Sequence, residues 1–432
     1  MQGLLEEALA TLVPSDAEQA AVAALCDSLL ARARKAAPDG VKPLLVGSVA
    51  KGTWLPGADI DLFLRFPEGA DLKAEGLALA RAVLPNGEEL YAQHPYLRGS
   101  VEGHSVDAVP CFAISDPSQP ASAVDRTVFH TAWVHDNLTD AQRDDVRLAK
   151  RFLAVAGAYG AAAAVGGFSG YLVEVLVHRA GDFPAFVEEV AGWRPPVALG
   201  AVPGAPEAEI TLPDPVDPGR NVAAGVMRDG LARAVLAARR FLAKPTADAF
   251  VVGAAERKPL GCVTTVVLPH PGGVEETALP HIQRQGRKLV RALEPFGVLG
   301  SHCSLGNEGF IVLETATVEL PERQLHRGPA AWDAGAFEFL AAYPQAPLRD
   351  GRFWALKPPL HPDIASAIHD LAPSRSTIPQ RATLPSAGVP RLRRAAAGAR
   401  AGGAAGRQLR RQHAPPRGAR VRRGAAARLR KG

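Results

Sequence analysis

The feature that most constrains this chain of 432 residues is a Gly-Ser pair followed, after a short gap, by two aspartates two positions apart. Gly47-Ser48 ends a short run rich in valine and leucine, Val41 to Val46, which predicts a strand. Asp59 and Asp61 stand at the start of the apolar run Ile60 to Phe66, which predicts a second strand. Side chains two positions apart on a strand point to the same side. The pattern therefore predicts two carboxylates on one face of a small sheet.

Paired carboxylates supply the hard oxygen ligands that Mg²⁺ prefers. Phosphoryl transfer with two metal ions normally uses a third carboxylate. Asp107, flanked by apolar residues on a predicted strand that Pro110 would end, supplies one. A Gly-rich turn lets backbone N–H groups approach phosphate oxygens, so we expect the Ser48 hydroxyl and the Lys51 ammonium to contact a triphosphate. A lone acid pair on a strand is usually a solvated face, but this combination favours a catalytic site.

The remaining periodicity predicts an α+β fold with alternating helical and strand segments. Helices are expected over 4–36, as a pair broken at Pro14 to Asp16, and over 139–180, 226–243 and 281–296. Further strands are expected over 89–96, 101–109, 209–212, 262–268 and 310–317. Residues 195–221, rich in Pro and Gly, predict a loop.

The net charge of +5 hides a strong asymmetry along the chain. After Asp370 there is no acidic residue, but there are 16 Arg or Lys residues. Subtracting those 16 charges from +5 leaves −11 for residues 1–370. Beyond Pro373 the composition turns to Ala, Arg, Gly and Pro without hydrophobic periodicity, which predicts a disordered basic tail. A nucleic-acid interpretation of the high pI would rest on that tail alone.

Several classes of protein are disfavoured. The four cysteines, Cys26, Cys111, Cys262 and Cys303, show no zinc-ligand spacing and fit free thiols in a reducing compartment. The acidic start of the chain has no basic segment of the kind that opens a signal peptide. No uncharged apolar stretch is long enough to span a bilayer. We therefore expect a cytoplasmic protein without a membrane partner.

The motif resembles the signature of the DNA polymerase β-like nucleotidyltransferase superfamily. More narrowly, seven segments in the same order resemble those of the archaeal (class I) CCA-adding enzymes. These segments are Gly47–Leu55, His94–Tyr96, Val106–Cys111, Ala123–His130, Val146–Leu153, Gly167–Glu174 and Asp214–Ala224. The resemblance covers about residues 1–360 and implies template-independent addition of CCA to the 3′ end of tRNA, from CTP and ATP, with release of pyrophosphate.

The resemblance also implies residue roles. The predicted metal ligands and catalytic residues, for two Mg²⁺ ions, are Asp59, Asp61 and Asp107. The predicted nucleotide contacts are Ser48, Lys51, His130, Lys150, Tyr159 and Arg220. Arg220 would read the Watson–Crick edge of CTP and ATP. Without the resemblance, His130 could be a satisfied polar residue at a helix start, Tyr159 a core residue, Lys150 a solvated helix face and Arg220 a surface charge.

The implied organisation has four parts: a palm-like nucleotidyltransferase head over 1–135, a helical central domain over 136–248, an RRM-like α+β domain over 249–372 and the tail over 373–432. The family's ordered ending is not recognisable after about Pro358. A shifted reading frame in GC-rich DNA would produce such a tail, and restoring a family-like ending in another frame would test that hypothesis. The alternative is a native basic tail that binds tRNA phosphates.

Three other functions fit part of this pattern. A poly(A) polymerase or oligoadenylate-type enzyme shares the chemistry but should ignore CTP. An RNA-binding protein inactivated by its altered C-terminus would keep the fold without the activity. An antibiotic nucleotidyltransferase shares the motif but needs no chain of this length. The sequence leaves the oligomeric state open, with a homodimer as one alternative.

Overall fold

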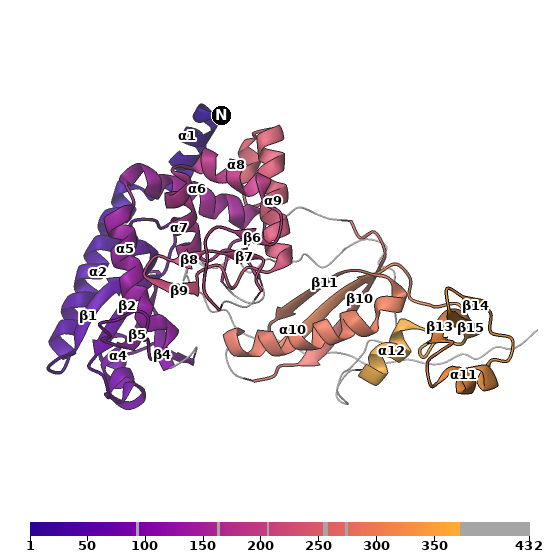
Figure 1. Ribbon diagram of the computed structural model, residues 1–432. Helices are drawn as coiled ribbons and strands as arrows, with labels where there is room; N and C mark the ends of the chain where they lie inside the picture. The colour runs from indigo at the N-terminus through magenta and orange to yellow at the C-terminus, as the bar shows by residue number, and fades with distance from the viewer. Residues whose placement is uncertain (92–94, 162–164, 205–206, 254–257, 273–274, 372–432) are drawn as a thin grey trace, which may run out of the picture. The chain divides into compact units, whose positions relative to one another are not determined.

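The structure is a computed structural model, which describes residues 1–91, 95–161, 165–204, 207–253, 258–272 and 275–371. Within these ranges the chain is a mixed α+β protein, as the sequence predicts (Figure 1). The predicted basic tail over 373–432 lies outside the described residues.

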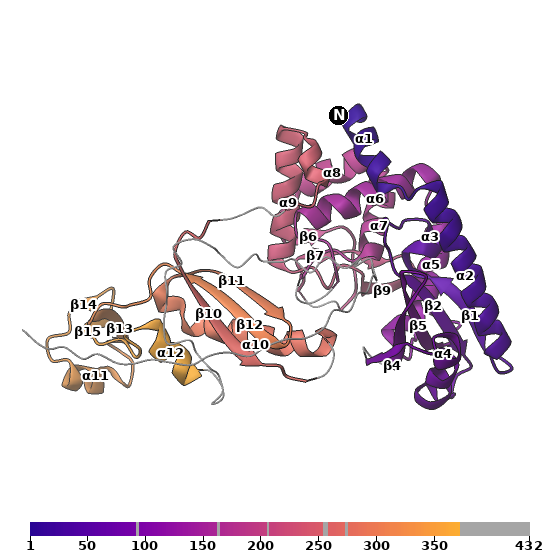
Figure 2. The ribbon, with the colours of Figure 1, turned by 180° about the vertical axis from the view of Figure 1, so that it is seen from behind.

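The chain begins with the predicted pair of helices, α1 (Gln2–Leu12) and α2 (Asp16–Ala36). Pro14 separates them, and the Ser15 hydroxyl caps α2 by accepting a hydrogen bond from the backbone N–H of Glu18. The α2 helix packs on the first strand of the sheet, as Figures 1 and 2 both show. The expected break in the helical pattern is thus confirmed.

A five-stranded sheet follows, in the order β1-β2-β5-β4-β3. Its strands are β1 (Lys42–Val46), β2 (Ile60–Phe66), β3 (Glu88–Tyr91), β4 (Pro95–Val101) and β5 (His104–Phe112). Only the central pair, β2 and β5, runs parallel among these strands. The sheet has apolar side chains on both faces: one face packs on α2 and α4 (Leu77–Val83), and the other packs on residues including Val128 of α5 (Thr127–Asn137).

Two strand predictions need correction. The single strand expected over 89–96 is two antiparallel strands, β3 and β4, and the residues between them are not described. Pro110 does not end β5, which continues to Phe112. The pairing of β5 with β4 stops at Ala108, so a residue without an N–H group is tolerated beyond that point.

The next part of the chain is mainly helical, with α6 (Asp140–Val155), α7 (Gly170–Ala180), α8 (Phe183–Gly192) and α9 (Arg228–Ala243). Helix α6 begins where the predicted helical stretch does, and Thr139 and Gln142 form a capping box at its start. The single helical stretch expected over 139–180 is instead two helices. The segment between them contains four glycines, which disfavour a continuous helix.

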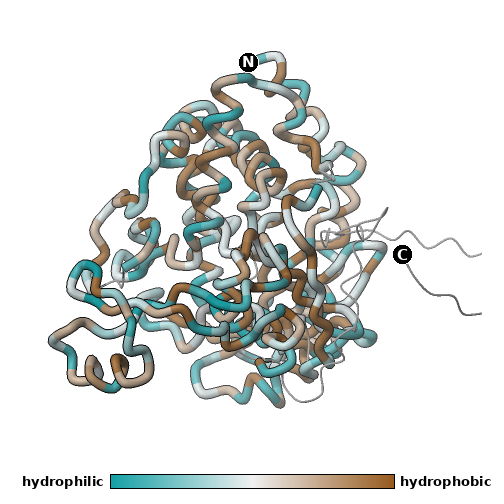
Figure 3. The backbone as a smooth tube through the Cα atoms, turned by 90° about the vertical axis from the view of Figure 1, so that its right-hand side faces the viewer, coloured by the Kyte–Doolittle hydropathy of each residue, from teal (hydrophilic) through white to brown (hydrophobic). Residues whose placement is uncertain are grey.

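One hydrophobic core joins these helices, and it includes residues from the start of the chain. Leu12 of α1 and Val134 of α5 are buried in it with the phenylalanines of α6, α8 and α9. In Figure 3, brown apolar stretches recur within the helices and strands that form such cores. Between α8 and α9 lie four short strands, paired as β6 with β7 and β8 with β9. Their bounds are Val197–Ala198, Ile210–Thr211, Pro213–Asp214 and Asp217–Asn221.

The C-terminal part has two three-stranded sheets, in the orders β10-β12-β11 and β13-β15-β14. The order β-α-β-β-α with an antiparallel 1-3-2 sheet agrees with the RRM-like expectation, and the second sheet is inserted before the last helix. The elements of this C-terminal part are β10 (Cys262–Pro269), α10 (Glu275–Ala292), β11 (Val298–Leu305), β12 (Glu308–Thr315), β13 (Gln324–Ala330), α11 (Ala336–Ala342), β14 (Leu348–Arg349), β15 (Arg352–Lys357) and α12 (Ile364–Leu371). Leu72–Gly76 (η1) forms a short π-helix, and three short 3₁₀ helices lie at Ala123–Arg126 (η2), Ala247–Phe250 (η3) and Glu294–Phe296 (η4).

Candidate active site

Two of the three predicted carboxylates lie side by side on the central strands of the sheet. Asp61 of β2 and Asp107 of β5 occupy the same register position of the parallel pair. Asp59 is exposed and comes directly before β2. Because neighbouring strands are about 4.8 Å apart, this register brings the Asp61 and Asp107 side chains to the same edge of one face.

The negative charges of these three carboxylates repel one another. Burial, together with the negative charges of Asp107 and Asp59, raises the pKa of Asp61 to about 7, against the positive charges of Lys51 and Arg98. A carboxylate held among other carboxylates is stabilised in its charged form by a bound cation. The chemistry of this donor set therefore fits a divalent metal ion, which prefers carboxylate oxygens.

Asp107 also has a protein partner that the sequence reasoning missed. The Arg98 guanidinium donates two hydrogen bonds to it, from Nε to Oδ1 and from Nη2 to Oδ2, both of 2.7 Å. Among the described residues no group of three His, Cys, Asp or Glu side chains is arranged to hold a metal ion. A hairpin with its turn at Glu102-Gly103 places Arg98 opposite Asp107, and Gly103, a residue type typical of turns, was the available signal in the sequence.

The backbone of the Gly-Ser turn touches the carboxylate site. Gly47 has a φ of +72°, and a Cβ atom there would lie 1.9 Å from Oδ2 of Asp61. Only glycine fits such a position. Ser48 follows in α3 (Gly47–Lys51), where its side chain is partly exposed. The predicted phosphate-binding turn and the predicted metal ligand are therefore in direct contact range.

Lys51 and Lys150 share one buried carboxylate, Glu174 of α7. The Lys51 ammonium is 2.9 Å from Oε2 of Glu174, and the Lys150 ammonium is 3.0 Å from Oε1. Glu174 also accepts a hydrogen bond of 2.6 Å from the Thr53 hydroxyl. All four residues are buried, with exposed fractions of 0 to 6%. We call these four residues the lysine cluster.

The charges of the lysine cluster determine the state of its acid. Burial alone would raise the pKa of Glu174, but Lys150 and Lys51 with the Thr53 hydrogen bond lower it to about 2. Glu174 is therefore ionised at neutral pH, and the cluster carries one net positive charge. Lys150 also donates to the carbonyl and hydroxyl oxygens of Thr53, so all three of its donors have protein acceptors.

A second buried acid, Asp214 of β8, gathers His130 and Arg220. Nε2 of His130 is 3.0 Å from Oδ2 of Asp214, and Nη1 of Arg220 is 2.6 Å from the same oxygen. Burial lowers the pKa of His130, although Asp214 acts in the opposite direction. The Tyr171 hydroxyl donates to Oδ1 of Asp214 at 3.1 Å, and its ring stacks on His130 with centroids 3.8 Å apart.

Tyr171 contacts both the lysine cluster and Asp214. The Lys51 ammonium lies 5.0 Å from the centroid of its ring, in a cation–π contact. Tyr159 lies beside the lysine cluster: its hydroxyl and the Lys150 ammonium both border Gly170. Burial, reinforced by the charge of Glu174, raises the pKa of Tyr159. Five of the six predicted nucleotide contacts thus lie around Glu174 or Asp214, and Ser48 lies in the turn preceding Lys51.

Glu174, Tyr171 and Asp214 received no role from the sequence. Glu174 and Tyr171 lie inside the segment Gly167–Glu174, where an acid on a helix surrounded by valine and leucine was an available signal. Arg147 was also missed. It donates from Nε to the carbonyl of Trp54 at 2.9 Å and from Nη2 to the carbonyl of Gly52 at 2.6 Å, and so holds the loop that follows Lys51.

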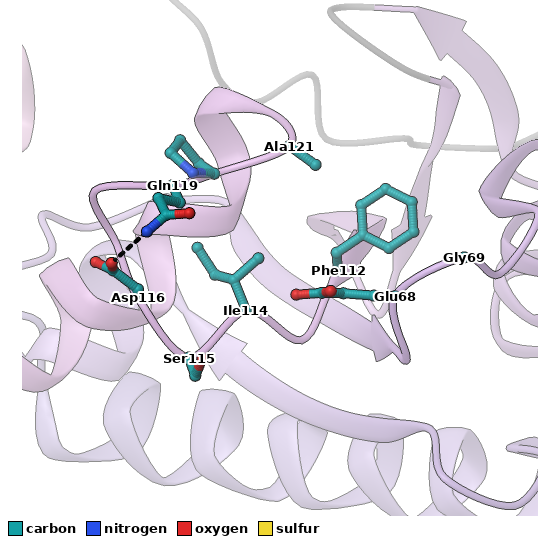
Figure 4. Close-up of a pocket in the computed structure, with 9 residues that line it drawn as sticks. Glu68, Gly69, Phe112, Ile114, Ser115, Asp116, Gln119 and Ala121 are labelled. Carbon is teal, nitrogen blue, oxygen red and sulfur yellow. Dashed lines mark hydrogen bonds between the residues drawn. The ribbon is translucent and has the colours of Figure 1, made fainter.

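A pocket of about 470 Å³ lies elsewhere (Figure 4). Its lining includes Phe112 and Asp116, which accepts a hydrogen bond of 3.1 Å from Gln119. It lies at the carboxyl ends of β2 and β5, whereas Asp61 and Asp107 lie toward their amino ends. It contains none of the predicted site residues. In the described part of the chain, no helix has the length and apolar character needed to cross a bilayer.

Comparison with known proteins identifies related families and relatives. The family model described as "Nucleotidyltransferase domain" matches residues 26–130, and "tRNA nucleotidyltransferase, second domain" matches residues 144–251. A CCA-adding enzyme of Halobacterium salinarum is 38% identical over 343 residues, which cover 73% of this chain and 75% of that protein. One from Methanothermobacter thermautotrophicus is 37% identical over 394 residues, which cover 84% of this chain and 87% of that protein.

Similarity to solved structures is much looser. A cytoplasmic RNA terminal U-transferase aligns with a TM-score of 0.44 and 15% sequence identity, over 57% of this chain and 96% of that chain.

Proposed function

Because this chain belongs to the family of CCA-adding enzymes, we propose that it completes the 3′ end of tRNA by adding C, C and A from CTP and ATP. The observation that supports this most directly is the shared register of Asp61 and Asp107 on parallel strands, with Asp59 directly before β2. Each addition joins the terminal hydroxyl of the RNA to the α-phosphate of the nucleotide and releases pyrophosphate.

We propose that Asp59, Asp61 and Asp107 hold two Mg²⁺ ions. When bound, these ions would activate the attacking hydroxyl and neutralise the charge that develops on the leaving pyrophosphate. The raised pKa of Asp61 supports this assignment, since it marks a carboxylate that needs a cation nearby. Arg98 occupies one acceptor site on each oxygen of Asp107, which leaves about two of the four sites of this carboxylate for a metal ion.

The triphosphate would be held by Ser48 and Lys51, near the backbone of Gly47. Lys51 has one protein acceptor, Glu174, among the described residues, so two of its three donors remain for phosphate oxygens. Lys150 would have to exchange one of its acceptors to bind phosphate directly. The net positive charge of the lysine cluster complements the negative charge of the nucleotide in either case.

The sugar and base would be held by His130, Tyr159 and Arg220. Arg220 is the most exposed of these contacts, with 39% of its side chain accessible, and it pairs with Asp214 within the hairpin of β8 and β9. The chain's own contribution to the chemistry is therefore positioning and charge neutralisation, with little covalent chemistry.

The test is extension of a labelled tRNA that ends at the discriminator base, with Mg²⁺ and with CTP and ATP given singly and together. We expect two added nucleotides with CTP alone and three with both. Asp61→Ala should abolish extension, whereas Asp116→Ala, in the pocket of Figure 4, should not. Long A-tails would favour a poly(A) polymerase. Failure of the folded protein to extend the RNA would contradict the proposal.

A further inference from the structure

The hairpin that carries Arg220 is anchored by two aspartates to one helical face. Strands β8 and β9 pair antiparallel, with Asp214 opposite Asp217. Asp217 accepts a hydrogen bond of 3.0 Å from Nε of Arg126, and Asp214 receives one from His130. Arg126 and His130 are four positions apart on continuous helical backbone, so both face the hairpin. The hairpin therefore has two separate attachment points.

Only one of these attachment points reaches Arg220. Asp214 is fully buried, and its two oxygens accept four hydrogen bonds: from Tyr171 and the backbone of Val216 on Oδ1, and from His130 and Arg220 on Oδ2. An ionised carboxylate has about four acceptor sites, so Asp214 is saturated. A saturated, buried carboxylate has one available orientation, and its contact with Nη1 thus restricts the direction of the Arg220 guanidinium.

The direction of a guanidinium matters because arginine can only donate hydrogen bonds. Cytosine and adenine both present an unprotonated ring nitrogen, an acceptor, on their Watson–Crick edges. Uracil and guanine present a ring N–H, a donor, at the equivalent position, and a carbonyl oxygen beside it. A guanidinium fixed toward the ring nitrogen can donate to cytosine and adenine, but it meets an N–H donor in uracil and guanine. A guanidinium that is free to turn can donate to the carbonyl oxygen instead, so it can bind all four bases.

We propose that Asp214 is a specificity-determining positioning residue, which holds the Arg220 guanidinium on the ring nitrogen that cytosine and adenine share. The inference rests on the proposed function, because it takes Arg220 as the group that contacts the base. Asp214 itself touches no nucleotide in this scheme. Its contribution is the orientation of Arg220, which His130 and Tyr171 support by occupying the other acceptor sites.

The test is the ratio of kcat/KM for CTP to that for UTP on tRNA lacking CCA, in the wild type and in Asp214→Asn. The asparagine keeps the shape, but its single oxygen can accept only two of the four hydrogen bonds, so the side chain no longer holds Arg220 in one direction. Losing a hydrogen bond to a charged group changes a ratio by about tenfold or more. We expect the ratio to fall by about that factor, and ATP to lose its advantage over GTP in the same way.

Asp217→Asn is the matched control, since it weakens the other attachment point of the same hairpin and leaves the Arg220 contact intact. It should retain the wild-type ratio. The proposal is overturned if Asp214→Asn lowers the use of all four nucleotides equally, or if Asp217→Asn relaxes the ratio as much. If Asp214→Asn does not fold, Arg220→Gln removes the same contact from the partly exposed side, and an unchanged ratio there overturns the proposal. A wild type that adds no CMP would instead contradict the proposed function.

Discussion

Replacing Glu174 with glutamine should destabilise the protein strongly, although the two side chains have nearly the same shape. The change leaves the ammonium groups of Lys51 and Lys150 buried without a counter-charge. Removing one partner of a buried ion pair costs about 3–5 kcal/mol. The lowering of the pKa of Glu174 from its ordinary 4.5 to about 2 corresponds to about 3 kcal/mol at 1.36 kcal/mol per unit. Both routes give a loss of at least about 3 kcal/mol.

Thermal unfolding at neutral pH is the assay for this loss. A change of 1 kcal/mol shifts Tm by about 2–4 °C in proteins of 150–250 residues, so we expect Glu174→Gln to lower Tm by roughly 6–12 °C. Glu189→Gln is the matched control, because Glu189 pairs with Arg179 near the surface at 3.2 Å. Exposed pairs contribute about 1 kcal/mol or less, so its Tm should change little.

The pH dependence provides a second test of the same reasoning. The folded-state pKa of Glu174 is depressed, so its stabilisation is present above about pH 4.5 and is lost as the pH falls toward 2. The gap in Tm between wild type and Glu174→Gln should be full at pH 7 and should narrow below pH 4.5. A gap that does not change between pH 7 and pH 3 would refute the argument from charge, as would a variant as stable as the wild type at pH 7.

Two further substitutions, with one control, test the backbone around the site. Gly47→Ala should abolish nucleotide addition, because its Cβ would lie 1.9 Å from the carboxylate of Asp61. The control is Gly57→Ala, where φ is +77° but no atom lies near the added Cβ. This control should lose only about 1–2 kcal/mol of stability, measured by Tm, and should keep its activity. Arg147→Lys replaces the two separate donor nitrogens that reach the carbonyls of Trp54 and Gly52 with a single ammonium. KM for CTP and ATP should therefore rise by roughly tenfold in steady-state assays, and an unchanged KM would show that the loop needs no such support.

The local sequence determined the elements that carry the catalytic motif. Strand β2 has the predicted bounds, Ile60–Phe66, because it is an apolar run that begins after a turn. The helix caps at Ser15 and Thr139 were also predictable, since capping depends on the cap residue and the few residues after it. The prediction for 89–96 was wrong because the apolar residues of two consecutive strands look like one strand in the sequence.

Only the tertiary structure decided which charges meet. Lys51 and Glu174 are 123 positions apart, and His130 and Asp214 are 84 apart, so no periodicity or spacing relates them. The pairs form because burial makes an unpaired charge costly, and the packing of α7 and β8 against the head supplies the partner. The sequence therefore predicted the residue types that the chemistry needs. The two acids that hold those residues in place emerged from the fold, because a buried charge is satisfied by its neighbours in space and not along the chain.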